Sequence, residues 1–336
     1  MSESPLTRLT RRIASLRVTL AGFALLGVAA YAVAAGAAQG RWLIAAPLFL
    51  LSLNLLAALL TCRCFRRQPS LFAVHVCLLL LGVLLGVGQL TRLTGHFEIA
   101  EGQGFDPASV AIDSRGEWNP GLPAGSAFRQ GPIQVAYDPG LLRRGTSSRV
   151  FLSGDGQGRP VDVADAKPLV LDGYRFYATH NKGFSALLSW RSDAGKLLRG
   201  TVHFPSYPRL ALGQVLEWRT PHGTSVELRL EPDPLPQDGW ILRAQRAGGR
   251  LGVRTRDGED QFLQPGQSLA LPGGVLRLEG FGMWMGYRVF YDPTLPWIFA
   301  CALLAVSMLA WYFWSRRELP LPGFAPAALT LQRTRA

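Results

Sequence analysis

The stretch from Leu71 to Leu90 reads LFAVHVCLLLLGVLLGVGQL, which is 20 residues without an Asp, Glu, Lys or Arg. A helix needs about 20 apolar residues to cross the hydrocarbon core of a bilayer, which is roughly 30 Å thick. The stretch therefore predicts a transmembrane helix. Three more stretches of this kind, 18–38, 42–60 and 295–314, each predict another. The expected fold class is an integral membrane α-helical protein with four transmembrane helices.

The charges of the chain predict how these helices are oriented. Of the 35 Lys and Arg residues, 12 lie outside residues 91–294, where only two acidic residues oppose them. These flanks carry a net +10 of the total +12, and residues 91–294 carry only +2. Short basic segments stay in the cytoplasm, so we expect both termini and the Arg63–Arg67 loop to be cytoplasmic. A nucleic-acid-binding protein would instead place its basic residues on a face of the folded domain.

Residues 91–294 predict an all-β extracytoplasmic domain. Short apolar or β-branched runs, such as Ile133–Tyr137 and Ser225–Leu230, are separated by turn sequences such as Asp138-Pro139-Gly140. Open sheet edges favour aggregation, so we expect a sandwich or a pair of small sheets. The resulting layout is a basic N-terminus at 1–17, three transmembrane helices within 18–90 (18–38, 42–60 and 71–90), the β-rich domain at 91–294, a fourth helix at 295–314 and a basic tail at 315–336.

The sequence contains no recognisable hydrolase or phosphate-binding motif. The pair Cys62 and Cys64 has neither the C-x-x-C spacing of a redox site nor the C-x-x-C-H spacing of haem attachment. Acid pairs such as Glu98 with Glu101 are interpreted as solvated loop residues. No catalytic residue is therefore assigned. The five histidines are His75, His96, His180, His203 and His222.

His75 differs from the other histidines because it lies inside an apolar stretch. An ionisable side chain in a membrane helix is costly and needs a partner. At 100° per residue, Gly82 and Gly86 share a helix face with His75. Two alternatives are open for this face: it accepts a flat ligand, with His75 as an iron ligand, or it packs a second helix, with His75 hydrogen-bonded across the pair.

An aromatic segment, Tyr174–Phe184, is predicted to form a strand, a turn carrying His180 and a second strand. Exposed strand edges of β domains bind extended peptides by pairing with them. The alternative is that these aromatic side chains face the core.

The order of several motifs resembles the ResB (CcsB) family of System II cytochrome c biogenesis. The motifs are Leu51-Ser52-Leu53-Asn54 leading into Thr61-Cys62-Arg63-Cys64, Val74-His75-Val76-Cys77 with Gly82 and Gly86, His96-Phe97-Glu98-Ile99, and Tyr291-Asp292-Pro293-Thr294 followed by Tyr312-Phe313-Trp314-Ser315. Three helices, a large outer domain and one closing helix are also the architecture of that family.

The resemblance implies a function. It implies that the chain is a subunit in the bacterial inner membrane and that its large domain lies in the periplasm. It also implies that this subunit pairs with a multi-span ResC (CcsA) partner. Such a pair carries haem b across the membrane and presents it to apocytochrome c. His75 matches the position of a family transmembrane haem ligand. The subunit is not expected to be catalytic alone, but to be part of a cytochrome c haem lyase (synthase) complex. This chain is shorter than typical family members, which makes it a compact variant.

A second hypothesis comes from a different class. The same helical frame could serve a non-catalytic assembly scaffold or sensor that displays the outer β domain and binds no haem. Haem content separates the two hypotheses.

Overall fold

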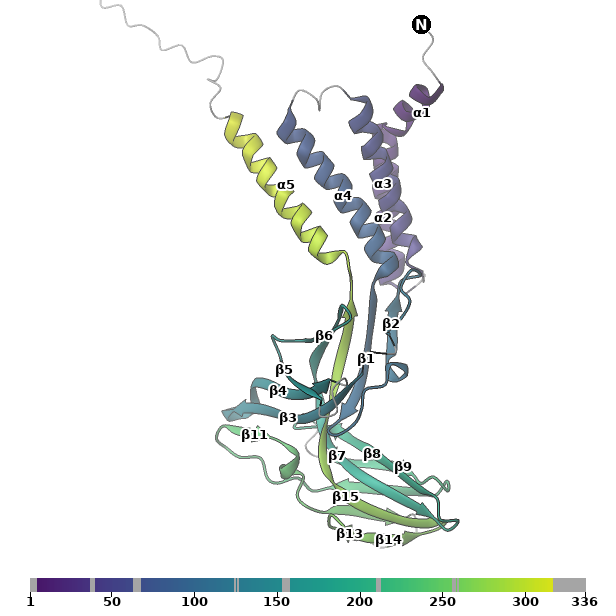
Figure 1. Ribbon diagram of the computed structural model, residues 1–336, viewed down its shortest axis with the longest axis vertical. Coiled ribbons are helices and arrows are strands. Elements are labelled where there is room, and N and C mark those ends of the chain that lie inside the picture. The colour runs from purple at the N-terminus through teal and green to yellow at the C-terminus, as the bar shows by residue number, and fades with distance from the viewer. Residues whose placement is uncertain are drawn as a thin grey trace, which may run out of the picture. The chain divides into compact units, whose positions relative to one another are not determined.

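The computed structural model describes residues 5–36, 40–62, 68–123, 125, 127–152, 158–209, 213–255, 258 and 260–316 (Figure 1). The chain divides into two compact units, one of Met1–Thr91 with Pro293–Ala336 and one of Arg92–Asp292. The first unit is helical and the second is built from strands. The prediction of four long apolar helices and a large β-rich region is confirmed.

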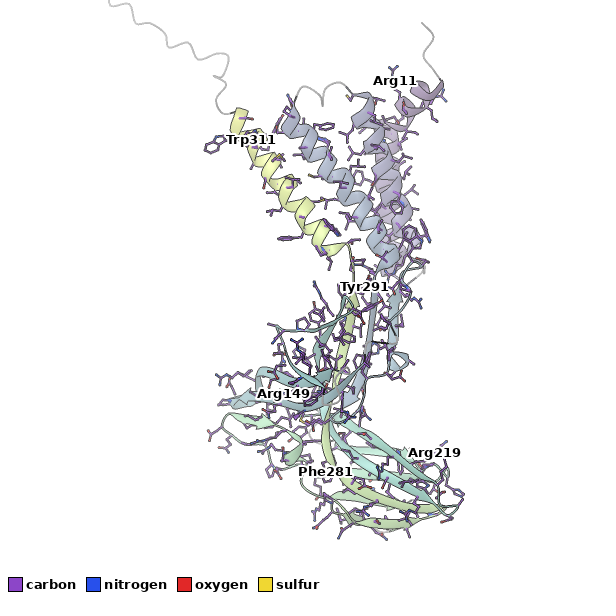
Figure 2. All side chains as sticks on the ribbon, in the orientation of Figure 1. Arg11, Arg149, Arg219, Phe281, Tyr291 and Trp311 are labelled. Atoms are coloured by element: carbon purple, nitrogen blue, oxygen red, sulfur yellow. The ribbon has the colours of Figure 1, made fainter. Side chains whose placement is uncertain are left out.

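The helical unit contains five helices among its described residues. They are α1 Pro5–Ile13, α2 Leu16–Ala34, α3 Trp42–Thr61, α4 Pro69–Thr91 and α5 Leu295–Arg316. All but α1 are long and apolar enough to span a membrane. Along the chain, α2 packs on α3, α3 on α4 and α4 on α5. Trp311 of α5 is 67% exposed and points away from α4 (Figure 2). Apolar side chains on the outer surface of these helices are what a lipid environment accommodates.

The largest differences from the expected helix boundaries lie at the first span and just before it. The first span was expected at 18–38 but begins at Leu16, because the Ser15 side chain caps it by accepting a hydrogen bond from the Val18 N–H. It ends at Ala34, and Gly36 then adopts a φ of 68° that favours glycine. The short helix α1 was not expected at all, since residues 1–17 were interpreted only as a basic segment. The Arg63–Arg67 loop and the 317–336 tail lie outside the described residues.

A buried polar cluster joins the first three helices. Asn54 of α3 is 5% exposed, and its Nδ2 donates hydrogen bonds to the carbonyl oxygens of Ile13 at 2.5 Å and Ser15 at 3.3 Å. Its Oδ1 accepts a hydrogen bond from the Thr19 hydroxyl at 2.8 Å. The Asn54 amide therefore donates hydrogen bonds to backbone carbonyl oxygens at the point where α1 ends and α2 begins. Polar side chains connect membrane helices in this way.

The described residues of the second unit form fifteen strands. They are β1 Leu93–Ala100, β2 Ala111–Arg115, β3 Phe128–Asp138, β4 Leu142–Leu152, β5 Arg159–Ala164, β6 Leu169–Leu171, β7 Tyr174–Ser192, β8 Leu197–Ser206, β9 Val215–Arg219, β10 Ser225–Leu230, β11 Trp240–Leu242, β12 Leu251–Thr255, β13 Gln261–Leu263, β14 Ser268–Leu271 and β15 Gly274–Tyr291. No α-helix occurs among the described residues of Arg92–Asp292.

The strands form three sheets rather than the expected sandwich or pair. One sheet of seven strands has the order β2-β1-β15-β7-β6, with β14 also on β15 and β8 also on β7. The two sheets of four have the orders β13-β12-β10-β9 and β11-β3-β4-β5. The reason is the length of β7 and β15, which are 19 and 18 residues long and pair with each other. Each long strand pairs with different neighbours at its two ends. The remaining strands form the two smaller sheets (Figure 1).

The predicted turn at His180 is wrong, because β7 continues through it. The register between β7 and β15 shifts between Met285 and Tyr287, so residues 179–181 lie opposite Gly286. The Thr179 hydroxyl donates a hydrogen bond of 2.8 Å to the Gly286 carbonyl and holds this bulge. A bulge inserts extra residues without ending the strand. His180 is consequently an exposed residue within a strand.

An aromatic cluster forms the core where the seven-stranded sheet meets β3 and β4. The Phe97 ring lies 4.6 Å from Phe105 and 5.4 Å from Tyr287, measured between ring centroids. The Tyr287 hydroxyl donates to Gln130 Oε1 at 2.9 Å, and Gln130 Nε2 donates to the Ser148 hydroxyl at 2.7 Å. Buried polar groups are tolerated when they bond one another.

Lys182 is buried in this unit although its side chain is ionisable. It lies on β7 and is only 2% exposed. Burial, together with nearby Arg143, lowers its pKa to about 8, and Asp165 partly opposes both effects. Removing an ammonium group from water disfavours its charged form.

We expect the stability of the protein to rise between pH 8 and pH 10. In this range the unfolded state still holds the Lys182 proton and the folded state releases it, so raising the pH favours folding. The gain is roughly 2–4 kcal/mol, and Lys182→Met removes it. Above pH 10 stability falls, because burial raises the pKa of Tyr137 and Tyr287 to about 12. Urea unfolding followed by tryptophan fluorescence at each pH measures the trend, with exposed Lys196→Met as the control.

Candidate functional site

His75 lies in the first half of α4 and is half-buried. Its Nδ1 is 2.8 Å from the carbonyl oxygen of Leu71, one turn earlier in the same helix. A carbonyl oxygen only accepts hydrogen bonds, so Nδ1 carries the hydrogen and a neutral ring has its lone pair on Nε2. A backbone hydrogen bond to one nitrogen is the arrangement that orients a histidine for metal binding through the other. The local geometry of His75 therefore fits an iron ligand.

The two glycines of the same helix face lie against α3. A Cβ atom added to Gly86 would be 2.7 Å from the Phe49 ring, and one added to Gly82 would collide with the Ser52 side chain. The Ser52 hydroxyl itself donates to the Leu48 carbonyl oxygen at 2.8 Å. In this structure Gly82 and Gly86 thus serve helix packing, which is one of the two alternatives for this face. Haem binding by this face stays a prediction.

The close approach of α3 and α4 gives a stability prediction. We expect Gly86→Leu to lower the free energy of unfolding by about 1–3 kcal/mol, because the new side chain has to displace the Phe49 ring. The matched control is Gly27→Leu in α2, where an added Cβ meets nothing within 4 Å. Thermal unfolding of the two variants in the same detergent gives the comparison. Equal losses would show that α3 and α4 do not pack through Gly86.

The structure also brings together a group of side chains that the sequence analysis separated. Glu98 of β1 lies 3.3 Å from His203 Nδ1 and accepts a hydrogen bond of 2.8 Å from the Asn181 amide. The hydrogen bond from His203 lowers the pKa of Glu98. The His203 ring stacks on Trp284 at a centroid distance of 5.3 Å. These residues come from β1, β7, β8 and β15, so only the sheet register joins them.

The interpretation of Glu98 and Glu101 as solvated loop residues holds only in part, because Glu98 is exposed but lies in a strand, and Glu101 lies in a turn but is half-buried. Glu98 is a strand residue with the partners just described. The Glu101 carboxylate accepts hydrogen bonds from the backbone N–H groups of Ile133 at 2.6 Å and Met283 at 3.1 Å. Burial raises the pKa of Glu101, and these two hydrogen bonds oppose the rise. Glu101 therefore connects β3 to β15 and has a structural role.

The remaining histidines do not assemble a metal centre. His96 Nδ1 lies 2.8 Å from the Asp113 carboxylate at the surface. His180 and His222 are exposed. Within the ranges that the structure describes, no three His, Cys, Asp or Glu residues are grouped so as to hold a metal ion. The helical unit contains a single histidine, His75, so this unit offers no second histidine to an iron at this position.

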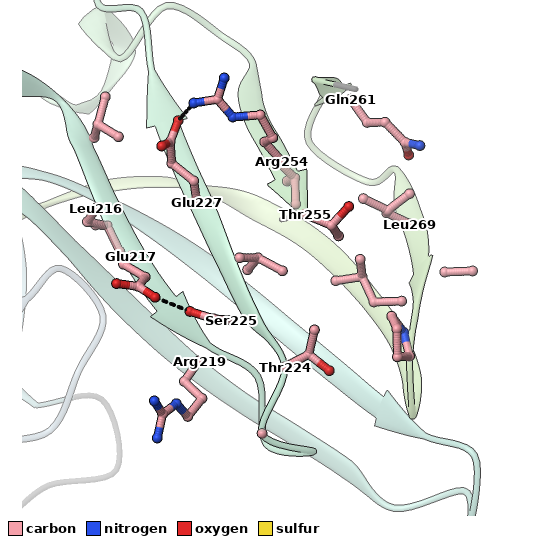
Figure 3. A pocket seen from close by; sticks show the side chains of 17 residues that line it. Leu216, Glu217, Arg219, Thr224, Ser225, Glu227, Arg254, Thr255, Gln261 and Leu269 are labelled. Atoms are coloured by element: carbon pink, nitrogen blue, oxygen red, sulfur yellow. Dashed lines mark hydrogen bonds and ion pairs between the residues drawn. The ribbon is translucent and has the colours of Figure 1, made fainter. Parts of the chain in front are cut away.

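A wide groove of about 1410 Å³ opens in the β unit (Figure 3). Its walls come from β9, β10, β12, β13 and β14. Glu227 forms an ion pair of 2.6 Å with Arg254, and Glu217 accepts a hydrogen bond from Ser225. The charged groups drawn in these contacts are already paired, and no histidine lines the groove. It offers no iron ligand of the kind His75 provides.

Comparisons with known proteins add little. No family model and no curated protein matches the sequence. Among solved structures, a protein titled "Cytochrome c Heme Lyase CcmF" matches with 13% sequence identity and a TM-score of 0.28. The match covers 89% of this chain and 35% of that chain. A similarity of this size does not define a shared fold, so the functional argument rests on the residues of this chain.

Proposed function

We propose that this chain is a ResB-like subunit of a System II cytochrome c synthase. In this role it cooperates with a multi-span ResC (CcsA) partner to hold haem b in the membrane and to present it to apocytochrome c. Haem is the cargo, and the chain supplies one axial ligand through His75. The four apolar helices are proposed to cross the bacterial inner membrane, with both termini in the cytoplasm and the β unit in the periplasm.

One observation carries the proposal. A histidine lies within a helix apolar enough to span a membrane, and its Nδ1 donates to the Leu71 carbonyl oxygen at 2.8 Å. Burying an imidazole in such a helix costs free energy, and a ligand bond through Nε2 offsets that cost. Since His75 is the single histidine of the helical unit, the partner is proposed to contribute the second axial ligand. Shared coordination of this kind makes haem binding depend on the complex.

A scaffold or sensor without haem is the second candidate, and it also has a supporting observation. Gly82 and Gly86 already pack against Ser52 and Phe49 of α3. In this function His75 has a structural role within the helical unit, and the helical unit anchors the β unit.

Maturation of c-type cytochromes in a deletion strain separates the two candidates. The synthase proposal expects covalent haem on c-type cytochromes to be lost on deletion and restored by the wild-type chain. His75→Ala, expressed to the same level, is expected to restore less than a tenth of it. The scaffold function is supported instead if His75→Ala restores maturation fully.

A further inference from the structure

Strand β8 forms an open edge of the seven-stranded sheet. It pairs with β7 from Leu197↔Arg191 to Gly183↔Ser206 and with no other strand of the described chain. At its end, the Phe204 carbonyl oxygen accepts a hydrogen bond of 2.8 Å from Nε1 of Trp284, which lies on β15 across β7. No described group bonds to the outward backbone of residues 197–203. A long unpaired edge of this kind is a template for another extended chain.

A basic hollow of about 400 Å³ lies beside this edge and crosses four strands, β8, β7, β15 and β14. The sheet register places Arg199 and Arg277 on either side of Ser189 in one row. In the next row Arg191 lies between Leu197 and Val275. Side chains two residues apart on a strand share a face, so all three arginines line the same surface.

The positive charge of this hollow is not neutralised within the described chain. Its single acidic residue is Glu279, which accepts a hydrogen bond from Ser189 at 2.6 Å and lies 3.7 Å from Arg277. Arg191 and Arg199 are exposed, and neither forms an ion pair with any residue that the structure describes. Three arginines against one carboxylate leave a net positive surface suited to acidic groups.

The opposite face of β7 and β15 is buried. Trp190 is 3% exposed and Leu276 is fully buried, and they alternate with the residues of the hollow. These two strands are therefore packed from one side, while Arg191 and Arg199 stay exposed on the other. Leu197, at the start of the edge, remains 47% exposed. The open edge thus presents the apolar side chain of Leu197 next to the charged side chain of Arg199 on the same face.

We propose that β8 binds an extended acidic segment of a partner protein by strand pairing. Backbone N–H and C=O groups of the segment bond to the open edge at residues 197–203, and every second side chain lies on the arginine face. An acidic side chain opposite Arg199 neutralises it, and an apolar side chain covers Leu197. Opposite charges on directly facing strand positions stabilise a pair.

The charge of the hollow favours this occupant over a second copy of the chain. Pairing β8 with β8 of another copy would bring two basic hollows together, and like charges on neighbouring strands destabilise a sheet. The proposal goes beyond haem handling, because every residue it uses belongs to the β unit. His75→Ala is therefore expected to bind the partner segment as the wild type does.

The probe for this site is a fluorescein-labelled ten-residue peptide of alternating Glu and Val, titrated with the full chain in an uncharged detergent. Fluorescence anisotropy reports binding. We expect Arg199→Glu to weaken binding at least tenfold and Arg219→Glu, an equally exposed change on β9, to alter it less than twofold. A matched peptide of Lys and Val is expected not to bind the wild type and to bind Arg199→Glu. Unchanged melting temperatures show that both variants fold.

Two further peptides, N-methylated at alternate residues in the two possible phases, test strand pairing itself. Only one phase places the methyl groups on the N–H groups that face β8, so one peptide should lose binding and the other retain it. Equal binding of both methylated peptides overturns strand pairing. Equal binding of the Glu and Lys peptides overturns the role of charge. No binding at millimolar peptide, or a chain that dimerises through β8 in sedimentation, overturns the proposal as a whole.

Discussion

We expect His75→Ala to lower the haem content of the proposed complex between this chain and a multi-span partner at least tenfold, while the amount of purified complex stays the same. The expected loss follows from the single histidine of the helical unit, whose Nδ1 donates to the Leu71 carbonyl oxygen, which leaves Nε2 as the nitrogen proposed to bind the iron. Alanine is a good helix former, so α4 itself should remain intact. The pyridine haemochrome assay gives the haem content.

Two comparisons make the His75 result specific. His222→Ala removes an exposed turn histidine of the β unit and is expected to leave the haem content unchanged. Imidazole added to a His75→Gly variant is expected to restore part of the haem signal, because it supplies the missing ligand without restoring any helix contact. Equal losses in the His75 and His222 variants would contradict a ligand role for His75.

Phe97→Ala is expected to have the largest effect on stability. The Phe97 side chain is 4% exposed, and its ring lies within 6.5 Å of four other aromatic rings. Those rings belong to Phe105, Phe128, Phe176 and Tyr287. Replacing a buried Phe by Ala costs about 3–5 kcal/mol, because the transfer of the ring from water is lost and a cavity remains.

The matched control for Phe97 is Phe262→Ala. Phe262 is 43% exposed and contacts the Arg250 guanidinium at 4.6 Å from the ring centroid. Removing such a surface contact costs about 0.5–1 kcal/mol. Urea unfolding of the full chain, followed by near-ultraviolet circular dichroism, measures both variants. A Phe97 loss no larger than the Phe262 loss would show that the aromatic cluster does not hold the β unit together.

The helices were predictable from the sequence because hydropathy is a local property. Every residue of a 20-residue apolar stretch favours the same apolar environment. For α3, the expected range 42–60 and the observed range Trp42–Thr61 therefore differ by one residue. Helix ends depend on caps and glycines, and the first span therefore shifted to Leu16–Ala34. The helix α1 is not predictable from hydropathy, because its nine residues include three arginines.

The arrangement of the β unit was less predictable, since it depends on contacts between distant residues. The segment around His180 was interpreted as a turn, and only pairing with β15 shows that β7 continues through a bulge. Glu98 and His203 are 105 residues apart in sequence, and nothing local to either residue announces their contact. The open edge of β8 likewise follows from which strands pair, and from which do not.

The candidate site divides in the same way. The position of His75 in an apolar helix is visible in the sequence, and so is the face that it shares with Gly82 and Gly86. The packing of that face against Ser52 and Phe49 is a tertiary contact that only the structure reveals. Haem binding by His75 stays a prediction, and the hydrogen bond from Nδ1 to the Leu71 carbonyl oxygen is the contact offered in its support.

The most direct test of the proposed haem handling is the visible absorption spectrum of the wild-type chain, purified in detergent together with the proposed multi-span partner. The proposed function predicts the absorption bands of a b-type haem with two axial ligands, at about one haem per complex. A colourless complex, purified from cells in which deletion of the chain leaves cytochrome c maturation intact, would contradict the proposed function.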